Sequence, residues 1–94
     1  MDRADVENKI ELVPEHKGLF GLGKIDGFRL KNKSLLPIKK IVLEVINETD
    51  NTPTMLTFEN ISPSGKSKEV QKVAKGFKPL LQKDGKLFII KEVE

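Results

Sequence analysis

The chain has 94 residues, enough for one domain with a single modest core, and its net charge of +3 is a weak basic excess. It contains no cysteine and one histidine, which excludes a disulfide framework, thiolate chemistry and a metal site built from several histidines. The chain has no apolar run long enough to span a membrane, and its charged N-terminus lacks the apolar stretch of a secretory signal. The compartment stays open: the cell envelope or surface if the chain is a piece of an exported protein, and the cytoplasm otherwise.

Period-two alternation of apolar and polar residues is the dominant pattern, and it predicts half-buried strands. The β-branched and aromatic residues in these stretches favour the same structure. The alternating stretches are 10–13, 28–31, 41–46 and 56–59, and an apolar run closes the series at 87–90. Turn-forming residues separate them at Pro14, Gly18 to Gly27, 32–37, 48–53 and 62–65. Turns that recur about every 8 to 15 residues are typical of a sandwich or barrel.

The glycine-rich stretch H-K-G-L-F-G-L-G-K-I-D at 16–26 is similar to a phosphate-binding loop. Gly18 to Lys24 fit the first seven positions of G-x-x-x-x-G-K-[ST], but Ile25 stands where the magnesium-binding hydroxyl belongs. The residues that follow alternate like a strand, whereas a phosphate-binding loop opens a helix. A second near-match, N-I-S-P-S-G-K-S at 60–67, lacks the first glycine. We therefore predict a turn in place of a nucleotide site, and this turn carries a candidate interaction loop: Leu19, Phe20 and Leu22.

The stretch K-S-K-E-V-Q-K-V-A-K-G at 66–76 is ambiguous between a strand and a short helix. Val70, Val73 and Phe77 have helical spacing, and Gly76 is suited to end such a helix. As a strand, the same stretch needs a bulge to bring both valines inward. Further on, D-G at 84–85 is the signature of a type I′ hairpin turn.

Basic residues are concentrated in two parts of the chain. Residues 24–40 carry six basic side chains and one acid, and residues 62–91 carry eight lysines against two acids. Residues 41–61 carry four acids and no base. Lysines on solvent-facing edges also keep sheets from pairing, so solvated decoration and a binding surface are both open interpretations. The candidate basic patch consists of Lys66, Lys68, Lys72, Lys75 and Lys78.

The residue types predict no catalytic, cofactor-binding or metal site, and hence a protein that is not an enzyme. The carboxylates have no spacing that implies acid–base pairing, and the serines have no base partner apart from the single His16. Nucleic-acid binding needs stacking aromatics as well as charge, and five phenylalanines without tyrosine or tryptophan make a poor platform. A small β-barrel that binds nucleic acid through its Lys-rich face is therefore the alternative function. A small enzyme or nucleotide binder is the third.

The stretch G-F-R-L-K-N-K-S-L-L-P-I-K-K-I-V-L-E-V at 27–45 has the order strand, loop with proline, long strand. It is followed by a polar turn, then by T-M-L-T-F-E-N, and then by I-S-P-S-G-K-S-K-E-V. This pattern resembles bacterial immunoglobulin-like β-sandwich modules of the FxLYD and CARDB-like group. More narrowly, it is similar to C-terminal modules of uncharacterised Bacteroidetes proteins. The resemblance covers about residues 17–73, and it implies that residues 66–73 form a strand.

The resemblance implies structural roles for several polar and turn residues. It implies that Asn32 and Ser34 shape a strand-to-strand loop, and that Ser62, Pro63 and Gly65 shape a turn. It implies no catalytic residue. The expected function is a non-catalytic structural or protein-interaction module of a larger bacterial protein. Its partner is then a protein, itself or another, and its oligomeric state stays open.

We therefore predict an all-β, immunoglobulin- or fibronectin-III-like sandwich of about seven strands. Residues 1–94 are expected to form this one domain, and the sequence leaves open whether residues 1–8 are ordered. Burial of about a dozen apolar side chains is the right scale to stabilise a domain of this size. The predicted core consists of Ile10, Leu12, Phe28, Leu30, Ile41, Leu43, Val45, Leu56, Phe58, Ile61, Val70, Leu87 and Ile89.

Overall fold

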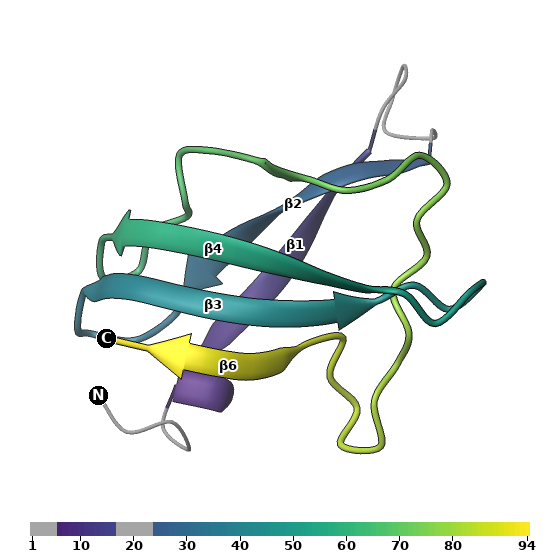
Figure 1. The fold of residues 1–94 in the computed structure, drawn as a ribbon. Helices are drawn as coiled ribbons and strands as arrows, with labels where there is room; N and C mark the ends of the chain where they lie inside the picture. Colours follow the sequence, from purple (N-terminus) through teal and green to yellow (C-terminus); the bar gives the residue numbers. More distant parts are fainter. Residues whose placement is uncertain (1–5, 17–23) are drawn as a thin grey trace.

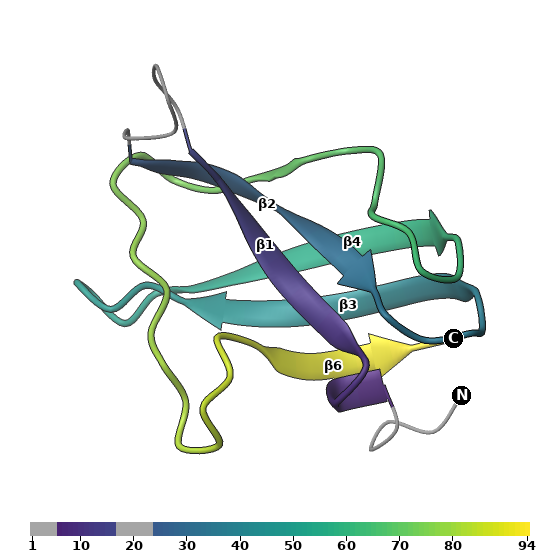
Figure 2. The same cartoon turned by 180° about the vertical axis from the view of Figure 1, so that it is seen from behind.

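The computed structural model describes residues 6–16 and 24–94, and it shows an all-β fold, as predicted. Within these ranges two antiparallel sheets of three strands have the orders β1-β2-β5 and β4-β3-β6. The two sheets face each other, and their strands cross at an angle (Figures 1 and 2). The strands are β1 (Ile10–His16), β2 (Ile25–Asn32), β3 (Ile38–Ile46), β4 (Pro53–Ile61), β5 (Gln71–Lys72) and β6 (Ile89–Val93).

One apolar core fills the space between the sheets. The alternation in the sequence predicted its larger part, because period two puts every second side chain of a strand on the inner face. The ring of Phe28 meets that of Phe77 edge to face, with centroids 6.1 Å apart. The predicted core residues that are buried are Ile10, Leu12, Phe28, Leu30, Ile41, Leu43, Val45, Leu56, Phe58 and Ile61.

The prediction was wrong for Val70, Leu87 and Ile89, which are half-buried. At the end of the chain it is Phe88 and Ile90 that are buried. Four adjacent apolar residues at 87–90 carry no alternation, so the pairing of Ile90 with Leu43 of β3 decides which of them face inward. The core also contains three residues that the pattern did not indicate, Val6, Ile38 and Phe77.

Strand β1 runs through Pro14, which the sequence pattern placed after the end of the strand. Proline lacks an N–H and is excluded from strands that pair on both sides. β1 is an edge strand in the order β1-β2-β5, so Pro14 pairs with Phe28 without the loss of a second partner. The register shifts between Glu15 and His16, where the strand ends.

The ambiguous segment after β4 runs along β2 as an interrupted strand. Lys66 pairs with Lys31, whereas Lys72 pairs with Gly27, so the seven residues 66–72 lie opposite the five residues 27–31. Between these pairs the Leu30 N–H of β2 donates a hydrogen bond to Ser67 Oγ at 2.9 Å. The serine hydroxyl thus takes the place of a backbone carbonyl of the neighbouring strand. The strand interpretation is therefore correct for Lys66, Gln71 and Lys72, which pair with β2, and the two extra residues between them form a bulge. Residues 73–76 belong to no strand.

The turn at 62–65 has the form that the resemblance implied. The Gly65 N–H donates to the Ser62 carbonyl at 3.1 Å, Pro63 is second, and Ser64 has a φ of 58°. A positive φ at the third position is the mark of a type II turn.

The turn at 82–86 differs from the predicted type I′ form. A type I′ turn needs positive φ at both central residues, and Asp84 has none. Instead, Gly85 follows the turn with a φ of 84°, and its N–H donates to the Gln82 carbonyl at 3.0 Å. The Gln82 N–H in turn donates to the Lys86 carbonyl at 2.8 Å. This arrangement is a tight turn with a glycine bulge.

Gly27 is needed where the segment after β4 passes closest to β2. A Cβ built at Gly27 would lie 2.6 Å from the Gln71 carbonyl oxygen and 2.6 Å from Val70 Cγ1. We expect Gly27→Ala to lower the free energy of unfolding by about 1–3 kcal/mol, because backbone must shift to admit the methyl group. Urea denaturation measures the loss. Gly65→Ala is the control, since its nearest atom would lie 3.2 Å away, and equal losses in both variants would contradict the packing argument.

The turn between β3 and β4 holds Asp50 in its ionised form. The Thr52 hydroxyl and N–H both donate to Asp50 Oδ1, at 2.7 and 3.1 Å, and they lower the pKa of this exposed carboxyl below its ordinary value of 3.8. Because the pKa of Asp50 is lower in the folded chain, its ionised carboxylate stabilises the folded state at a pH above the ordinary pKa. This stabilisation is lost as the pH falls through the lowered pKa. NMR titration should show that Thr52→Val raises the pKa of Asp50. An unchanged midpoint would contradict the role of the hydroxyl.

Candidate functional site

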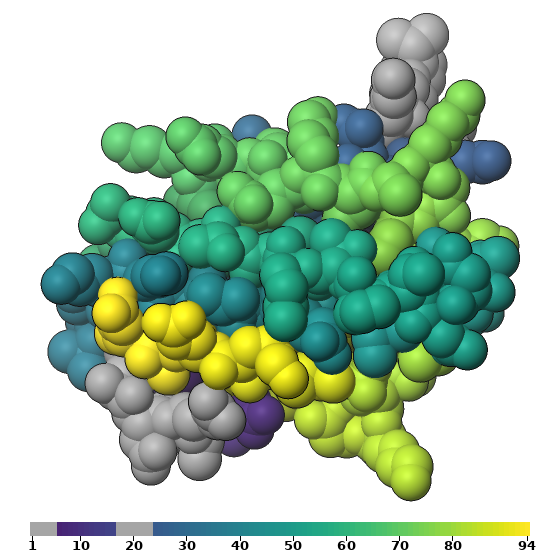
Figure 3. All heavy atoms as spheres, viewed as in Figure 1, coloured from purple at the N-terminus to yellow at the C-terminus, as the bar shows by residue number. Residues whose placement is uncertain are grey.

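The sequence indicated two candidate interaction regions. The loop residues Leu19, Phe20 and Leu22 lie outside the described residues. The five lysines of the basic patch are all exposed, and they follow one another along the connection that leaves β4. In the space-filling view this connection, drawn in green, lies along one side of β4 (Figure 3). The lysine positions are Lys66, Lys68, Lys72, Lys75 and Lys78.

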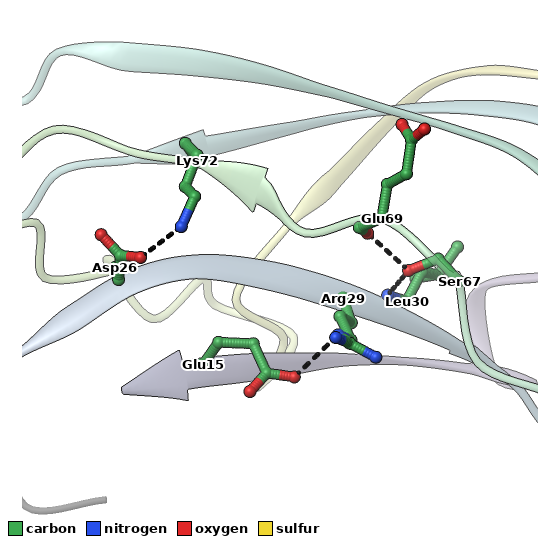
Figure 4. A network of polar contacts seen from close by, with 7 residues as sticks. All are labelled: Glu15, Asp26, Arg29, Leu30, Ser67, Glu69 and Lys72. Carbon is green, nitrogen blue, oxygen red and sulfur yellow. Dashed lines mark hydrogen bonds and ion pairs between the residues drawn. The ribbon is translucent and has the colours of Figure 1, made fainter. Parts of the chain in front are cut away.

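The connection that carries these lysines (the lysine connection) lies beside two acids from other strands, Asp26 of β2 and Glu59 of β4, and contains Glu69 itself. Lys72 forms an ion pair with Asp26 of β2 (Figure 4). Lys68 lines a groove of about 570 Å³ together with Glu59 and Glu69. The charge at Lys68 and Lys72 is therefore mixed, and it attracts a polyanion less than the count of lysines in the sequence indicates.

Basic residues of β2 and of the loop after it are likewise matched by acids of β1. Arg29 Nε lies 3.0 Å from Glu15 Oε1, an ion pair drawn in Figure 4, and Lys33 Nζ lies 4.0 Å from Glu11 Oε2. These are exposed pairs of modest strength. Their consequence is that the outer face of this sheet carries both signs of charge.

The two sequences similar to phosphate-binding loops have other structural roles where the structure describes them. β2 begins at Ile25, so a strand and not a helix follows the first near-match. In the second near-match, the hydroxyl of Ser67 accepts from the Leu30 N–H and donates to the Glu69 carbonyl at 3.3 Å (Figure 4). Neither arrangement is the loop-to-helix junction that cradles phosphate.

The described ranges 6–16 and 24–94 contain no group of three or more His, Cys, Asp or Glu side chains that could hold a metal ion. In the same ranges no helix is long and apolar enough to cross a membrane. A further candidate in the described chain is the surface at the loop between β2 and β3.

The side chain of Asn32 is fully buried at the end of β2 and organises this loop. Its Nδ2 donates to the Leu36 carbonyl at 2.8 Å and to the Ser62 carbonyl at 3.2 Å, and it lies 3.5 Å from the Ile61 carbonyl. Leu36 belongs to the loop, whereas Ile61 and Ser62 lie at the end of β4. One amide group therefore joins the loop to the second sheet.

Ser34 continues this network within the loop. Its N–H donates to Asn32 Oδ1 at 3.0 Å, and its hydroxyl lies 2.7 Å from the same oxygen and 2.9 Å from the Leu36 carbonyl. The Leu36 N–H donates back to Ser34 Oγ at 3.3 Å. The polar groups of Asn32, Ser34 and Leu36 thus bond to one another, so Asn32 and Ser34 shape this loop, as the resemblance implied.

The loop presents two leucine side chains to solvent. Leu35 is 87% exposed and Leu36 is 58% exposed, and we call this pair the leucine tip. Leu36 also lines a groove of about 560 Å³ with Pro37 and Pro63, which we call the tip groove. A rigid apolar projection beside a partly apolar groove is suited to contact with another protein.

The leucine tip was missed by the sequence reasoning, which assigned 32–37 to a turn. The available signal was the pair of adjacent leucines at 35–36 inside a polar loop, without the alternation that would place one of them in a core.

We expect Asn32→Ala to lower the free energy of unfolding by about 1–3 kcal/mol, because it leaves buried carbonyl and N–H groups without partners. Chemical denaturation measures the loss. The control is Asn47→Ala, since Asn47 Oδ1 accepts from the Thr49 and Lys78 N–H groups at 3.3 Å each in an exposed turn where water replaces it. A loss no larger than that of the control would contradict the central role of the buried amide.

Comparison with protein-family models, with curated proteins and with solved structures found no match for this chain. A function is therefore inferred from the leucine tip, the tip groove and the charge distribution described above.

Proposed function

We propose that the chain is a non-catalytic protein-interaction module with an immunoglobulin-like β-sandwich fold, and that the leucine tip is its contact surface. The sheet orders support the fold. In an immunoglobulin sandwich, strands A, B and E are neighbours in one sheet, and strand C lies between C′ and F in the other. The orders β1-β2-β5 and β4-β3-β6 have these neighbours if the strands are read as A, B, C, C′, E and F.

The observation that carries the function is the exposure of Leu35 on a loop that buried hydrogen bonds hold in place. An exposed leucine loses about 1.5–3 kcal/mol of burial free energy relative to a buried one. In a flexible loop such a side chain folds back onto the protein surface. Here the hydrogen bonds of Asn32 and Ser34 hold the backbone, so Leu35 stays 87% exposed. Holding an apolar side chain ready for contact reduces the ordering cost of binding.

The alternative function, nucleic-acid binding through the lysine connection, receives less support from the described residues, because acids from β2 and β4 lie among those lysines. Titration with labelled single-stranded and duplex oligonucleotides at about 50 and 200 mM salt separates the two. A steep fall in affinity with salt would favour this alternative, since phosphate contacts release counterions.

A photo-crosslinking amino acid at position 35 tests the proposed contact in the cell that makes the protein. We expect a discrete adduct of higher mass from position 35. Position 81 is the control, because Leu81 is 63% exposed in a different loop. Neither substitution is expected to change the free energy of unfolding by more than about 0.5 kcal/mol. Absence of an adduct at 35, or equal adducts at both positions, would contradict the proposal.

A further inference from the structure

We propose that the partner of the leucine tip is a second copy of this chain, bound through a reciprocal two-fold contact. This inference rests on the proposed function and names the partner of the same site. In the contact, Leu35 of each copy enters the tip groove of the other copy.

The position of the projection relative to the groove favours a contact between two copies. Leu35 projects from the loop, and its neighbour Leu36 lines the tip groove. The groove wall continues with Pro37 from the same loop and with Pro63 from the turn after β4. A two-fold axis that passes between projection and groove places each Leu35 over the groove of the other copy. Such an isologous contact buries both apolar features at once and closes after two copies.

The charge of the tip groove is also suited to a second copy. The chain has a net charge of +3, and its lysine-rich segments repel a second copy. The tip groove, in contrast, is lined by one lysine and one glutamate, Lys39 and Glu94. Across the two-fold axis, Lys39 of one copy faces Glu94 of the other, and the reverse pair forms at the same time. The Glu94 N–H donates to the Lys40 carbonyl at 2.8 Å, which keeps the backbone of Glu94 beside β3.

The rigidity of the site lowers the cost of such a contact. The amide of Asn32 bonds both to the loop that carries Leu35 and to the Ser62 carbonyl beside Pro63. The projection and one wall of the groove are thus held by the same buried group, so little conformational freedom is lost when two copies meet. The contact involves few residues, and small interfaces are weak and transient. We therefore expect a dissociation constant in the range of about 10 μM to 1 mM.

Sedimentation of the full chain from about 10 μM to 1 mM tests the association, and it should show a monomer–dimer equilibrium. Leu35→Ser should weaken the dimer about tenfold or more, because the side chain that fills the groove is lost. Leu81→Ser, at an exposed leucine in a different loop, should leave the dissociation constant unchanged. A dimer that Leu35→Ser does not weaken would overturn the proposal.

A charge exchange tests the two-fold geometry itself. Lys39→Glu puts two carboxylates opposite each other at both cross-pairs, and Glu94→Lys puts two ammonium groups there, so each variant alone should be monomeric. In an equimolar mixture, a mixed dimer has opposite charges at both cross-pairs, so the mixture should dimerise although neither variant does so alone. The double variant Lys39→Glu/Glu94→Lys restores opposite charges at both cross-pairs and should dimerise alone. A double variant that stays monomeric, while the wild-type chain dimerises, would overturn the reciprocal contact.

Self-association and the proposed function fail in different ways. A wild-type chain that stays monomeric at about 1 mM overturns self-association. If the crosslink at position 35 then still gives an adduct, and its mass is not that of two chains, the tip binds a different protein and the proposed function stands. If neither a dimer nor an adduct forms, both proposals are wrong.

Discussion

The side-chain amide of Asn32 is the constraint on which one end of the molecule depends. It sits on the last residue of β2, in the first sheet, yet its donors reach carbonyl groups at the end of β4 in the second. An amide suits this place because it offers two donors and an acceptor on one short side chain. The acceptor orders the loop through Ser34, and the donors join that loop to the opposite sheet. A buried group with these partners is costly to remove and leaves the loop one arrangement.

The same amide links the stability of the fold to the surface that we propose as a contact. A loop held only by its own turn would let Leu35 collapse onto neighbouring side chains. With the loop anchored in the core, the backbone directs that side chain away from the protein. Stability and exposure therefore share one origin in this loop, and they cannot be altered separately by changes at Asn32.

Much of the fold was predictable, because alternation carries its own information about which face is buried. This worked for β2, β3 and β4, where apolar and polar residues alternate over much of each strand. It failed at 87–90, where all four residues are apolar and only the pairing with β3 decides. It also failed at Pro14, because no local pattern says that β1 is an edge strand.

The candidate site was less predictable than the fold. The lysines could be counted in the sequence, but the Asp26 that pairs with Lys72 lies 46 residues away in the chain. The exposure of the leucine tip depends on a buried amide whose partners come from two sheets, and no local window contains them all.

The order β4-β3-β6 has a consequence for the biosynthesis of the chain. β3 is the central strand of its sheet, and its two partners are made at very different times. β4 emerges from the ribosome soon after β3, whereas β6 is the last strand in the described chain. Until then, one edge of the apolar strand I-K-K-I-V-L-E-V-I has no partner and resembles the open edges through which nascent chains aggregate. Translation that stalls between β4 and β6 would thus yield an adhesive fragment, and a chaperone that protects the nascent chain has a defined strand edge to cover.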